Sequence, residues 1–319
     1  MISVLKENNL LGGSKLRRKG KMIWILLGLV LCLLIIMMVR CTSWINKAEE
    51  RLETFQDKVQ TIDTSYGKMS YIDEGSGEVI LIIHGLFGGY DQGYDSMKEL
   101  VNTYRIIAPS RFGYVGSDLP EHATVTDQVN ALKELLDELN IDKAYVVGTS
   151  AGGLCALKFG ILYPERVKGV GLYCSGAVPL TKPTGDEMVK YASIPKTLCN
   201  DFALWAMGPI MKKAMSMTDD VWLSVFPVSA RAKGVINDGY EVNIDSEKHF
   251  DDYTLEELKV PVLILHAKDD KMASYEKVEK MTSRIPNVNL VSFETGGHMM
   301  TGNDEAVEKA MIDFIEMNK

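Results

Sequence analysis

The sequence Gly-Thr-Ser-Ala-Gly-Gly at residues 148–153 decides the fold of this chain. It follows the β-rich run Ala144–Val147 and opens a helix-like stretch from Leu154 to Tyr163. A serine between two glycines at a strand-to-helix turn is the G-x-S-x-G pattern of a nucleophile elbow, a turn so tight that only small residues fit two positions either side. The pattern predicts that the Ser150 hydroxyl projects from the sheet beside the N-terminus of the following helix.

A second glycine-rich turn predicts an oxyanion hole. The sequence His-Gly-Leu-Phe-Gly-Gly at residues 84–89 follows the apolar, strand-like run Val79–Ile83. Small residues in such a turn let backbone N–H groups face a substrate carbonyl and stabilise the negative charge that develops on its oxygen. We expect the N–H groups of Leu86 and Ala151 to be these two donors.

Two later strand-like runs end in the residues that complete a triad. Val260–His266 is followed by Asp269 and Asp270, and Val288–Phe293 is followed by Gly-Gly-His, which ends at His298. A serine hydroxyl is a poor nucleophile until a base takes its proton. We expect the histidine to be that base and then the acid that protonates the leaving group. The order serine, aspartate, histidine along the chain agrees with this assignment.

From about Tyr66 to the C-terminus the chain resembles the α/β-hydrolase superfamily, in its serine hydrolase form with a lid. The resemblance rests on the strand end His84-Gly85, the elbow at Ser150, the acid at Asp270 and the pair Gly297-His298. It implies that His84 and Gly85 support the oxyanion loop structurally. The family's acid usually stands three residues after a glycine, a position that Ala267 holds here. We therefore expect Asp270, rather than Asp269, to orient the imidazole of His298.

The pattern of strands and helices predicts one α/β domain over residues 61–319. Strand-like runs alternate with amphipathic helices at about Val125–Leu139 and Glu305–Met317, which indicates a mainly parallel sheet with helices on both faces. The alternation stops between about Ala177 and Tyr253, over a segment too long for a simple connection. The resemblance implies that residues 177–253 are an inserted helical lid over the active site.

The expected lid is rich in large apolar residues. Part of this set must form the lid's own core, and the remainder is a candidate lining for an apolar acyl pocket, since methionine packs irregular surfaces well. The sequence assigns no single residue to either role. The set comprises Phe202, Leu204, Trp205, Met207, Ile210, Met211, Met215, Met217, Trp222 and Phe226.

An apolar run at residues 22–39 predicts a transmembrane signal anchor. The run contains no charged residue. As a helix it spans roughly 27 Å, close to the hydrocarbon core of about 30 Å. Lys21 and Arg40 can reach the interface at its two ends. A cleaved signal peptide is the alternative, but it has an apolar core of about 7–15 residues and a small-residue cleavage site, which fit less well.

Basic residues on either side of this run predict its orientation. Residues 1–40 contain seven basic and one acidic residue, a net charge of +6, and the remainder carries −14. The positive-inside rule therefore makes residues 1–21 a basic cytoplasmic segment and places the hydrolase domain on the extracytoplasmic side. An acidic domain gives no support for a nucleic-acid partner. The basic residues before the run are Lys6, Lys15, Arg17, Arg18, Lys19 and Lys21.

Residues 40–60 are expected to form an amphipathic stalk helix. Apolar residues recur there at helical spacing. Such a helix either packs on the domain or lies along the membrane surface, and the sequence leaves both open. The residues of this stripe are Trp44, Ala48, Leu52, Phe55 and Val59.

The remaining motifs exclude several kinds of site. The five cysteines include no C-x-x-C pair and no zinc-ligand spacing. The chain also lacks H-E-x-x-H, a Walker loop and a dinucleotide fingerprint. We therefore expect no cofactor and no metal ion, and we infer no obligate protein partner.

Together these features predict a membrane-anchored serine hydrolase that binds a small-molecule ester. The expected reaction is cleavage of a carboxylic ester, with an apolar acyl or alcohol portion, through an acyl-enzyme. Thioester, amide and carbon–carbon bond hydrolysis use the same triad and stay open. The competing class is a small-molecule receptor that keeps the fold with little or no catalysis.

Overall fold

The computed structural model describes residues 2–185 and 190–319, with side chains from residue 22 onward. The chain divides into two compact units, Met1–Asn46 and Lys47–Lys319. Helix α1 (Ile2–Glu53) is continuous through the first unit and into the second. The side chains of the predicted basic segment, residues 1–21, lie outside the described part.

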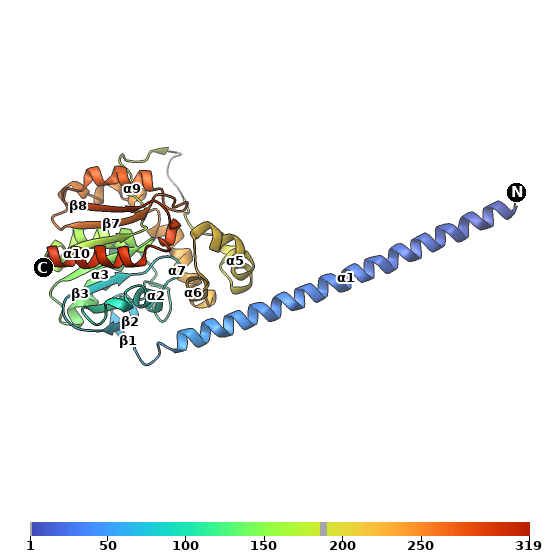
Figure 1. Ribbon diagram of the computed structural model, residues 1–319, viewed down its shortest axis with the longest axis horizontal. Helices are drawn as coiled ribbons and strands as arrows, with labels where there is room; N and C mark the ends of the chain where they lie inside the picture. Colours follow the sequence, from blue (N-terminus) through green and yellow to red (C-terminus); the bar gives the residue numbers. More distant parts are fainter. Residues whose placement is uncertain (1, 186–189) are drawn as a thin grey trace. The chain divides into compact units, whose positions relative to one another are not determined.

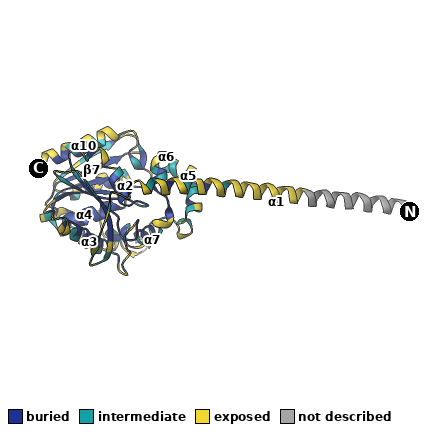
Figure 2. Cartoon of the chain, turned by 90° about the horizontal axis from the view of Figure 1, so that it is seen from below, coloured by how far each residue is buried: buried dark blue, intermediate teal, exposed yellow. Residues whose placement is uncertain are grey.

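Helix α1 contains a stretch that is long and apolar enough to cross a membrane. This stretch begins at Met22. Its 18 most apolar consecutive residues have a mean hydropathy of 3.1, and none of them is buried. Residues 22–36 are exposed (Figure 2), whereas Cys41 and Ala48, nearer the end of α1, are buried. The length and composition are those of a membrane anchor or of a signal sequence.

An eight-stranded sheet organises the second unit (Figure 1), with the strand order β1-β2-β4-β3-β5-β6-β7-β8. The β1–β2 and β2–β4 pairs are antiparallel, and all other pairs are parallel. The predicted mainly parallel sheet is therefore confirmed. The strands are β1 (Val59–Thr64), β2 (Gly67–Glu74), β3 (Val79–Ile83), β4 (Arg105–Pro109), β5 (Ala144–Thr149), β6 (Val167–Tyr173), β7 (Val262–Ala267) and β8 (Val288–Phe293).

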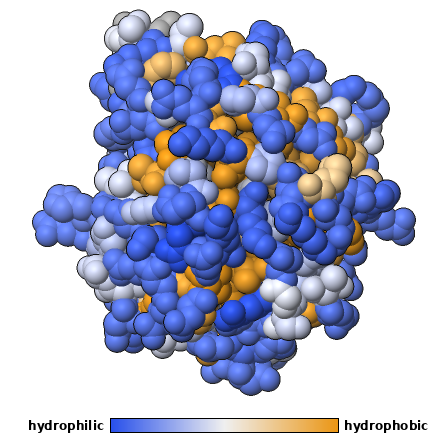
Figure 3. Space-filling view, turned by 90° about the vertical axis from the view of Figure 1, so that its left-hand side faces the viewer, coloured by the Kyte–Doolittle hydropathy of each residue, from blue (hydrophilic) through white to orange (hydrophobic). Residues whose placement is uncertain are grey.

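Helices cover both faces of this sheet because its strands are apolar on both sides. Helices α3 (Val125–Glu138), α4 (Gly152–Leu162) and α9 (Tyr275–Met281) share one core with Leu81 and Val146. Helices α2 (Tyr90–Asp95) and α10 (Asp304–Met317) share the other with the alternate strand residues Ile82 and Val147. The face of the molecule in Figure 3 is mostly hydrophilic, with smaller apolar areas between polar side chains.

The predicted insertion lies between β6 and β7 and is helical in its described part. It contains α5 (Asp201–Met215), α6 (Asp219–Ser224), α7 (Ala232–Asn237) and α8 (Asp245–Lys248), joined by short turns. Leu204, Trp222 and Phe226 are buried, with an edge-to-face contact between the Trp222 and Phe226 rings. Phe202 and Ile210 are exposed.

The structure differs from the predicted stalk helix of residues 40–60. Helix α1 ends at Glu53, and Val59 already belongs to β1, which pairs with β2 before the expected domain start at residue 61. Pairing with β2 gives this segment interstrand hydrogen bonds, and the β-branched Val59, Thr61 and Ile62 favour an extended chain. The apolar stripe itself is real, since Leu52 and Phe55 pack against the core of the domain.

Candidate active site

The turn between β5 and α4 holds Ser150 in a strained conformation. Its φ is 50°, in the left-handed region that a residue with a side chain rarely adopts. The Ser150 N–H donates to the carbonyl of Tyr173 on the neighbouring strand β6 at 2.8 Å. A Cβ added at Gly148 would lie 2.4 Å from the Gly152 carbonyl oxygen, so only glycine fits there. The turn has the geometry expected of a nucleophile elbow.

The lack of space at Gly148 predicts a large loss of stability in Gly148→Ala. The added methyl would force backbone to move, at a cost of about 2–3 kcal/mol in the free energy of unfolding. Gly176→Ala is the matched control, because nothing lies within 4 Å of a Cβ there. We expect it to change stability by less than about 0.5 kcal/mol. Thermal unfolding of the full-length protein followed by circular dichroism measures both; equal melting temperatures would contradict this account of the elbow.

The three predicted triad residues meet at one end of the sheet. The Ser150 Oγ lies 2.9 Å from Nε2 of His298, and Nδ1 of His298 lies 2.8 Å from Oδ2 of Asp270. Ser150 follows β5, Asp270 follows β7 and His298 lies in the short turn after β8. The His298 side chain is 5 % exposed, so little water competes for its hydrogen bonds. Both distances are within hydrogen-bond range, as a serine, its base and the group that orients the base require.

Asp270 is held as a carboxylate by several donors. Its Oδ1 accepts the backbone N–H groups of Met272 at 2.7 Å and Ala273 at 3.1 Å. Burial favours the neutral carboxyl, but hydrogen bonds from His266 and His298 outweigh burial and hold the pKa of Asp270 well below its usual range. The stability that this carboxylate contributes is therefore present above about pH 4 and is lost as the pH falls further, toward its folded-state pKa.

Asp269, the alternative acid, contacts backbone groups instead of the His298 imidazole. Its Oδ1 accepts the backbone N–H of Gly297 at 2.8 Å, and its Oδ2 lies 3.4 Å from the N–H of Gly296. Both contacts are to the turn that carries His298. Asp269 therefore orders the backbone of that turn, whereas Asp270 contacts the imidazole itself.

His266, the last residue of the strand-like run before Asp269, is a further contact of Asp270. Its Nε2 lies 3.0 Å from the Ala273 carbonyl and 3.2 Å from Oδ2 of Asp270, and the ring is fully buried at the end of β7. A proton on Nε2 is the assignment that satisfies both acceptors. The sequence does show a histidine four residues before the acid. However, the turn between the two residues decides whether the imidazole points toward Asp270.

The predicted oxyanion donors lie beside Ser150. A Cβ added at Gly85 would lie 3.2 Å from the Ser150 Cβ, which shows how closely the loop passes over the elbow. Within residues 2–185 and 190–319, the N–H groups of Leu86 and Ala151 have no protein acceptor. A positive φ of 58° at Phe87 turns the loop at this point. Two unpaired N–H groups next to a serine are the arrangement that an oxyanion hole needs.

His84 ties the oxyanion loop to the end of β4. Its Nε2 accepts the backbone N–H of Arg111 at 2.9 Å, so Nδ1 carries the proton and donates to the Gly85 carbonyl at 2.7 Å. Burial, with the nearby Arg111 charge, holds the pKa of His84 well below its usual value. A neutral imidazole with both nitrogens bonded to backbone fits the expected supporting role.

Two buried ion pairs join the lid to this loop, and sequence reasoning missed both. Arg111 pairs with Asp238 of the lid at 2.6 Å and donates to the carbonyls of His84 and Gly85 at 3.0 and 3.2 Å. The Asp238 charge raises the pKa of Arg111 above its usual value despite burial. Arg231 of the lid pairs in the same way with Asp91. No local pattern marks these residues, because each partner lies more than 100 positions away.

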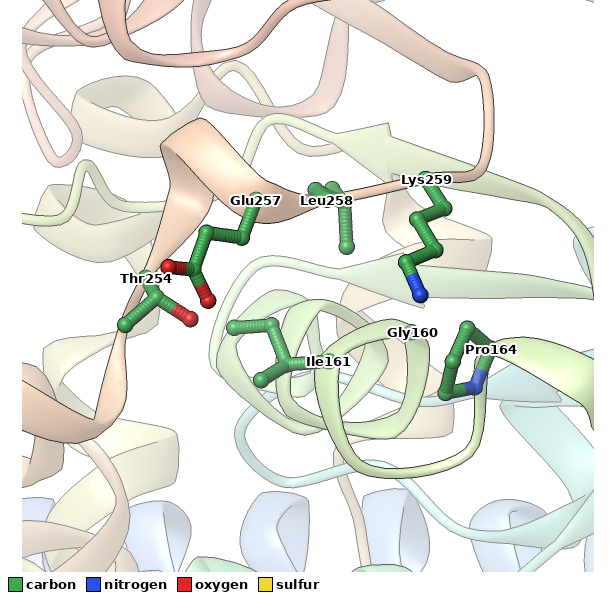
Figure 4. A pocket seen from close by; sticks show the side chains of 7 residues that line it. All are labelled: Gly160, Ile161, Pro164, Thr254, Glu257, Leu258 and Lys259. Atoms are coloured by element: carbon green, nitrogen blue, oxygen red, sulfur yellow. The ribbon is translucent and has the colours of Figure 1, made fainter.

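A cavity of about 180 Å³ lies away from the triad. It is formed by the end of α4 and residues 254–259, before β7 (Figure 4). Its lining includes no residue of the triad or of the oxyanion loop. Among the described residues no cluster of three histidine, cysteine, aspartate or glutamate side chains is placed to hold a metal ion.

Comparison with known proteins identifies the family. The model of the alpha/beta hydrolase fold family matches residues 78–302. The chain therefore belongs to the α/β-hydrolase fold family. It is 27% identical over 270 residues to a 2-hydroxy-6-oxo-6-phenylhexa-2,4-dienoate hydrolase of Burkholderia cepacia, covering 76% of this chain and 89% of that one. It is 25% identical over 252 residues to an uncharacterized carboxylesterase of Bacillus subtilis, covering 75% and 80%.

Solved structures agree on the fold. An esterase from Exiguobacterium antarcticum superposes with a TM-score of 0.67 at 22% identity, over 81% of this chain and 99% of that one. The naproxen esterase of Bacillus subtilis gives a TM-score of 0.61 at 20% identity, over 84% and 96%. The relatives are esterases and hydrolases, including hydrolases of carbon–carbon bonds, which supports a hydrolase activity.

Proposed function

We propose that this protein is a serine hydrolase that cleaves a carboxylic ester with an apolar portion. The observation that carries the proposal is the continuous hydrogen-bonded series from Ser150 Oγ through His298 to the carboxylate of Asp270. A receptor that only binds a small molecule has no need for a serine in contact with a base that is itself oriented by a buried carboxylate. The carboxylesterase relative supports an ester as the substrate.

The proposed reaction follows from the roles of the three side chains. His298 takes the Ser150 proton as Oγ attacks the ester carbonyl, and the N–H groups of Leu86 and Ala151 stabilise the oxyanion. His298 then gives the proton to the leaving alcohol, and the carbon–oxygen bond breaks to form an acyl-enzyme. Water, deprotonated by the same imidazole, releases the acid and restores Ser150. Asp270 fixes the imidazole tautomer throughout.

Hydrolysis of a carbon–carbon bond is the second candidate. It is favoured by the 27% identical relative named as a dienoate hydrolase. The purified full-length protein should therefore be assayed with p-nitrophenyl esters of increasing acyl length and with 2-hydroxy-6-oxo-6-phenylhexa-2,4-dienoate. Faster turnover of the esters supports our proposal, and faster turnover of the dienoate replaces it with the second candidate.

A fluorophosphonate probe separates an enzyme from a receptor. The probe labels a serine only when its base and oxyanion donors are assembled. We expect labelling of the wild-type protein at Ser150. A folded wild type that binds small molecules, is stabilised by them and resists the probe would favour the receptor.

We further propose that residues 22–39 anchor the protein in a membrane as an uncleaved signal anchor, with residues 1–21 cytoplasmic. The apolar stretch of α1 and the excess of basic residues before it support this topology. Protease added to intact cells is expected to degrade the domain beyond Cys41. Full protection of the domain would contradict the orientation, and a mature protein that begins after Val39 would contradict the anchor.

A further inference from the structure

Arg51, near the end of α1, contacts the helix that follows the oxyanion loop. Its Nη1 lies 2.6 Å from Oδ2 of Asp91, and its Nη2 lies 2.5 Å from Oδ2 of Asp95. Both carboxylates belong to α2, which begins at Tyr90, directly after the loop. The Asp91 side chain is fully buried, whereas the Arg51 side chain is 18 % exposed. A residue in the last turn of α1 therefore binds a carboxylate that is buried in the domain.

The same carboxylate is shared with Arg231 of the lid. Arg231 Nη2 lies 3.0 Å from Oδ2 of Asp91, and Nη1 lies 3.2 Å from Oδ1. Nη1 also donates to the carbonyl of Gly88, in the oxyanion loop, at 2.8 Å. Asp91 thus stands between two guanidinium groups, one of which holds the loop directly. The shortest of its ion-pair contacts is the one from Arg51.

The charges in this cluster explain why Arg51 matters for the loop. Burial disfavours the charged form of Asp91, but Arg231 and Arg51 together hold its pKa below the usual value. Without Arg51, the carboxylate would keep only the two longer contacts from Arg231. The distance between Arg231 and Asp91 would then shorten, because an isolated buried ion pair is stabilised most by short, direct contacts. Nη1 of Arg231 would then move away from the Gly88 carbonyl, and the loop would lose a tether.

We propose that Arg51 is a positioning residue for the oxyanion hole, acting through Asp91 and Arg231 on the carbonyl of Gly88. The segment between the apolar run and the sheet then helps to position the oxyanion loop, in addition to joining that run to the domain. This inference rests on the proposed serine hydrolase function. It predicts that loss of Arg51 slows the formation of any tetrahedral species at Ser150, since that species needs both oxyanion donors in place.

The test compares Arg51→Ala with the wild type as full-length proteins in detergent. We expect kcat for p-nitrophenyl butyrate and the rate of fluorophosphonate labelling to fall about tenfold, with KM within about twofold, because the misplaced donors act in the transition state. Millimolar guanidinium should restore most of both rates, since the Arg51 side chain is 18 % exposed and its vacated site can be reached from solvent. The control is Arg105→Ala, which removes a bidentate pair with Asp73 away from the oxyanion loop and should change neither rate.

The outcomes separate this inference from the proposed function. Labelling of Arg51→Ala at the wild-type rate would overturn the inference, as would a loss of rate that guanidinium does not restore. If Arg51→Ala does not fold, Arg51→Met keeps the packing of the side-chain stem on the Phe55 ring and is expected to show the same tenfold loss. A wild type that resists labelling would instead count against the serine hydrolase function.

Discussion

Ser150→Ala is expected to lower kcat for p-nitrophenyl esters by about 10⁶ while the protein stays folded. The variant removes the only atom that forms the acyl-enzyme in the proposed mechanism, and His298 is left without a proton to take. Alanine keeps the backbone of the elbow close to its present form, because the main-chain N–H of residue 150 still has the Tyr173 carbonyl as its acceptor. The residual rate would come from the oxyanion donors and binding alone.

Steady-state kinetics, fluorophosphonate labelling and circular dichroism measure this result together. Ser283→Ala is the control, since this exposed serine donates its hydroxyl to the Lys280 carbonyl at the surface. It should label and turn over as the wild type does. Turnover by Ser150→Ala within tenfold of the wild type would show that another group carries the chemistry, and the triad assignment would fail.

The parts of the site that local sequence could predict are those fixed by short-range geometry. The elbow at Ser150 needs small residues two positions away, and that requirement is visible in six residues of sequence. The strand ends before Asp270 and His298 are visible as apolar runs. Because parallel strands end at the same edge of the sheet, three separate strand ends bring these side chains together without further information.

The buried charges around the oxyanion loop show what local patterns leave out. Arg111 and Asp238 are ordinary polar residues in sequence, and only the folded lid brings their side chains to 2.6 Å. The same holds for Arg51, since no local pattern links it to Asp91, its partner 40 positions away. Whether a charge is solvated or buried depends on tertiary contacts, and no periodicity within one segment contains that information.

The end of the stalk helix shows how tertiary contacts override periodicity. Phe55 and Val59 continue the helical spacing, yet the chain turns after Glu53 and Val59 enters β1. The edge of β2 offers interstrand hydrogen-bond partners to residues 59–64, whose β-branched side chains favour an extended chain. A further helical turn would have offered only its own hydrogen bonds, so the sheet determines where the helix ends.

The neighbouring residues Asp269 and Asp270 allow a matched comparison. We expect Asp270→Asn to lower kcat by about 10⁴, because an amide in place of Oδ2 can present its N–H to Nδ1 of His298 and favour the wrong tautomer. Nε2 would then carry a proton and could not accept the one from Ser150. Asp269→Asn keeps an oxygen for the N–H of Gly297, so its hydrogen bond survives in neutral form. We expect it to lower kcat by less than about tenfold.

The two variants differ in mechanism as well as in magnitude, which gives the comparison a second readout. If Asp270 acts by fixing the tautomer, Asp270→Asn should regain activity at high pH, where hydroxide replaces the missing base. Asp269→Asn should keep the shape of the wild-type pH profile, since it alters only the turn that carries His298. A larger loss in Asp269→Asn than in Asp270→Asn would make Asp269 the functional acid. It would also mean that the turn between β7 and α9 rearranges when substrate binds, because only then would Asp269 reach the imidazole.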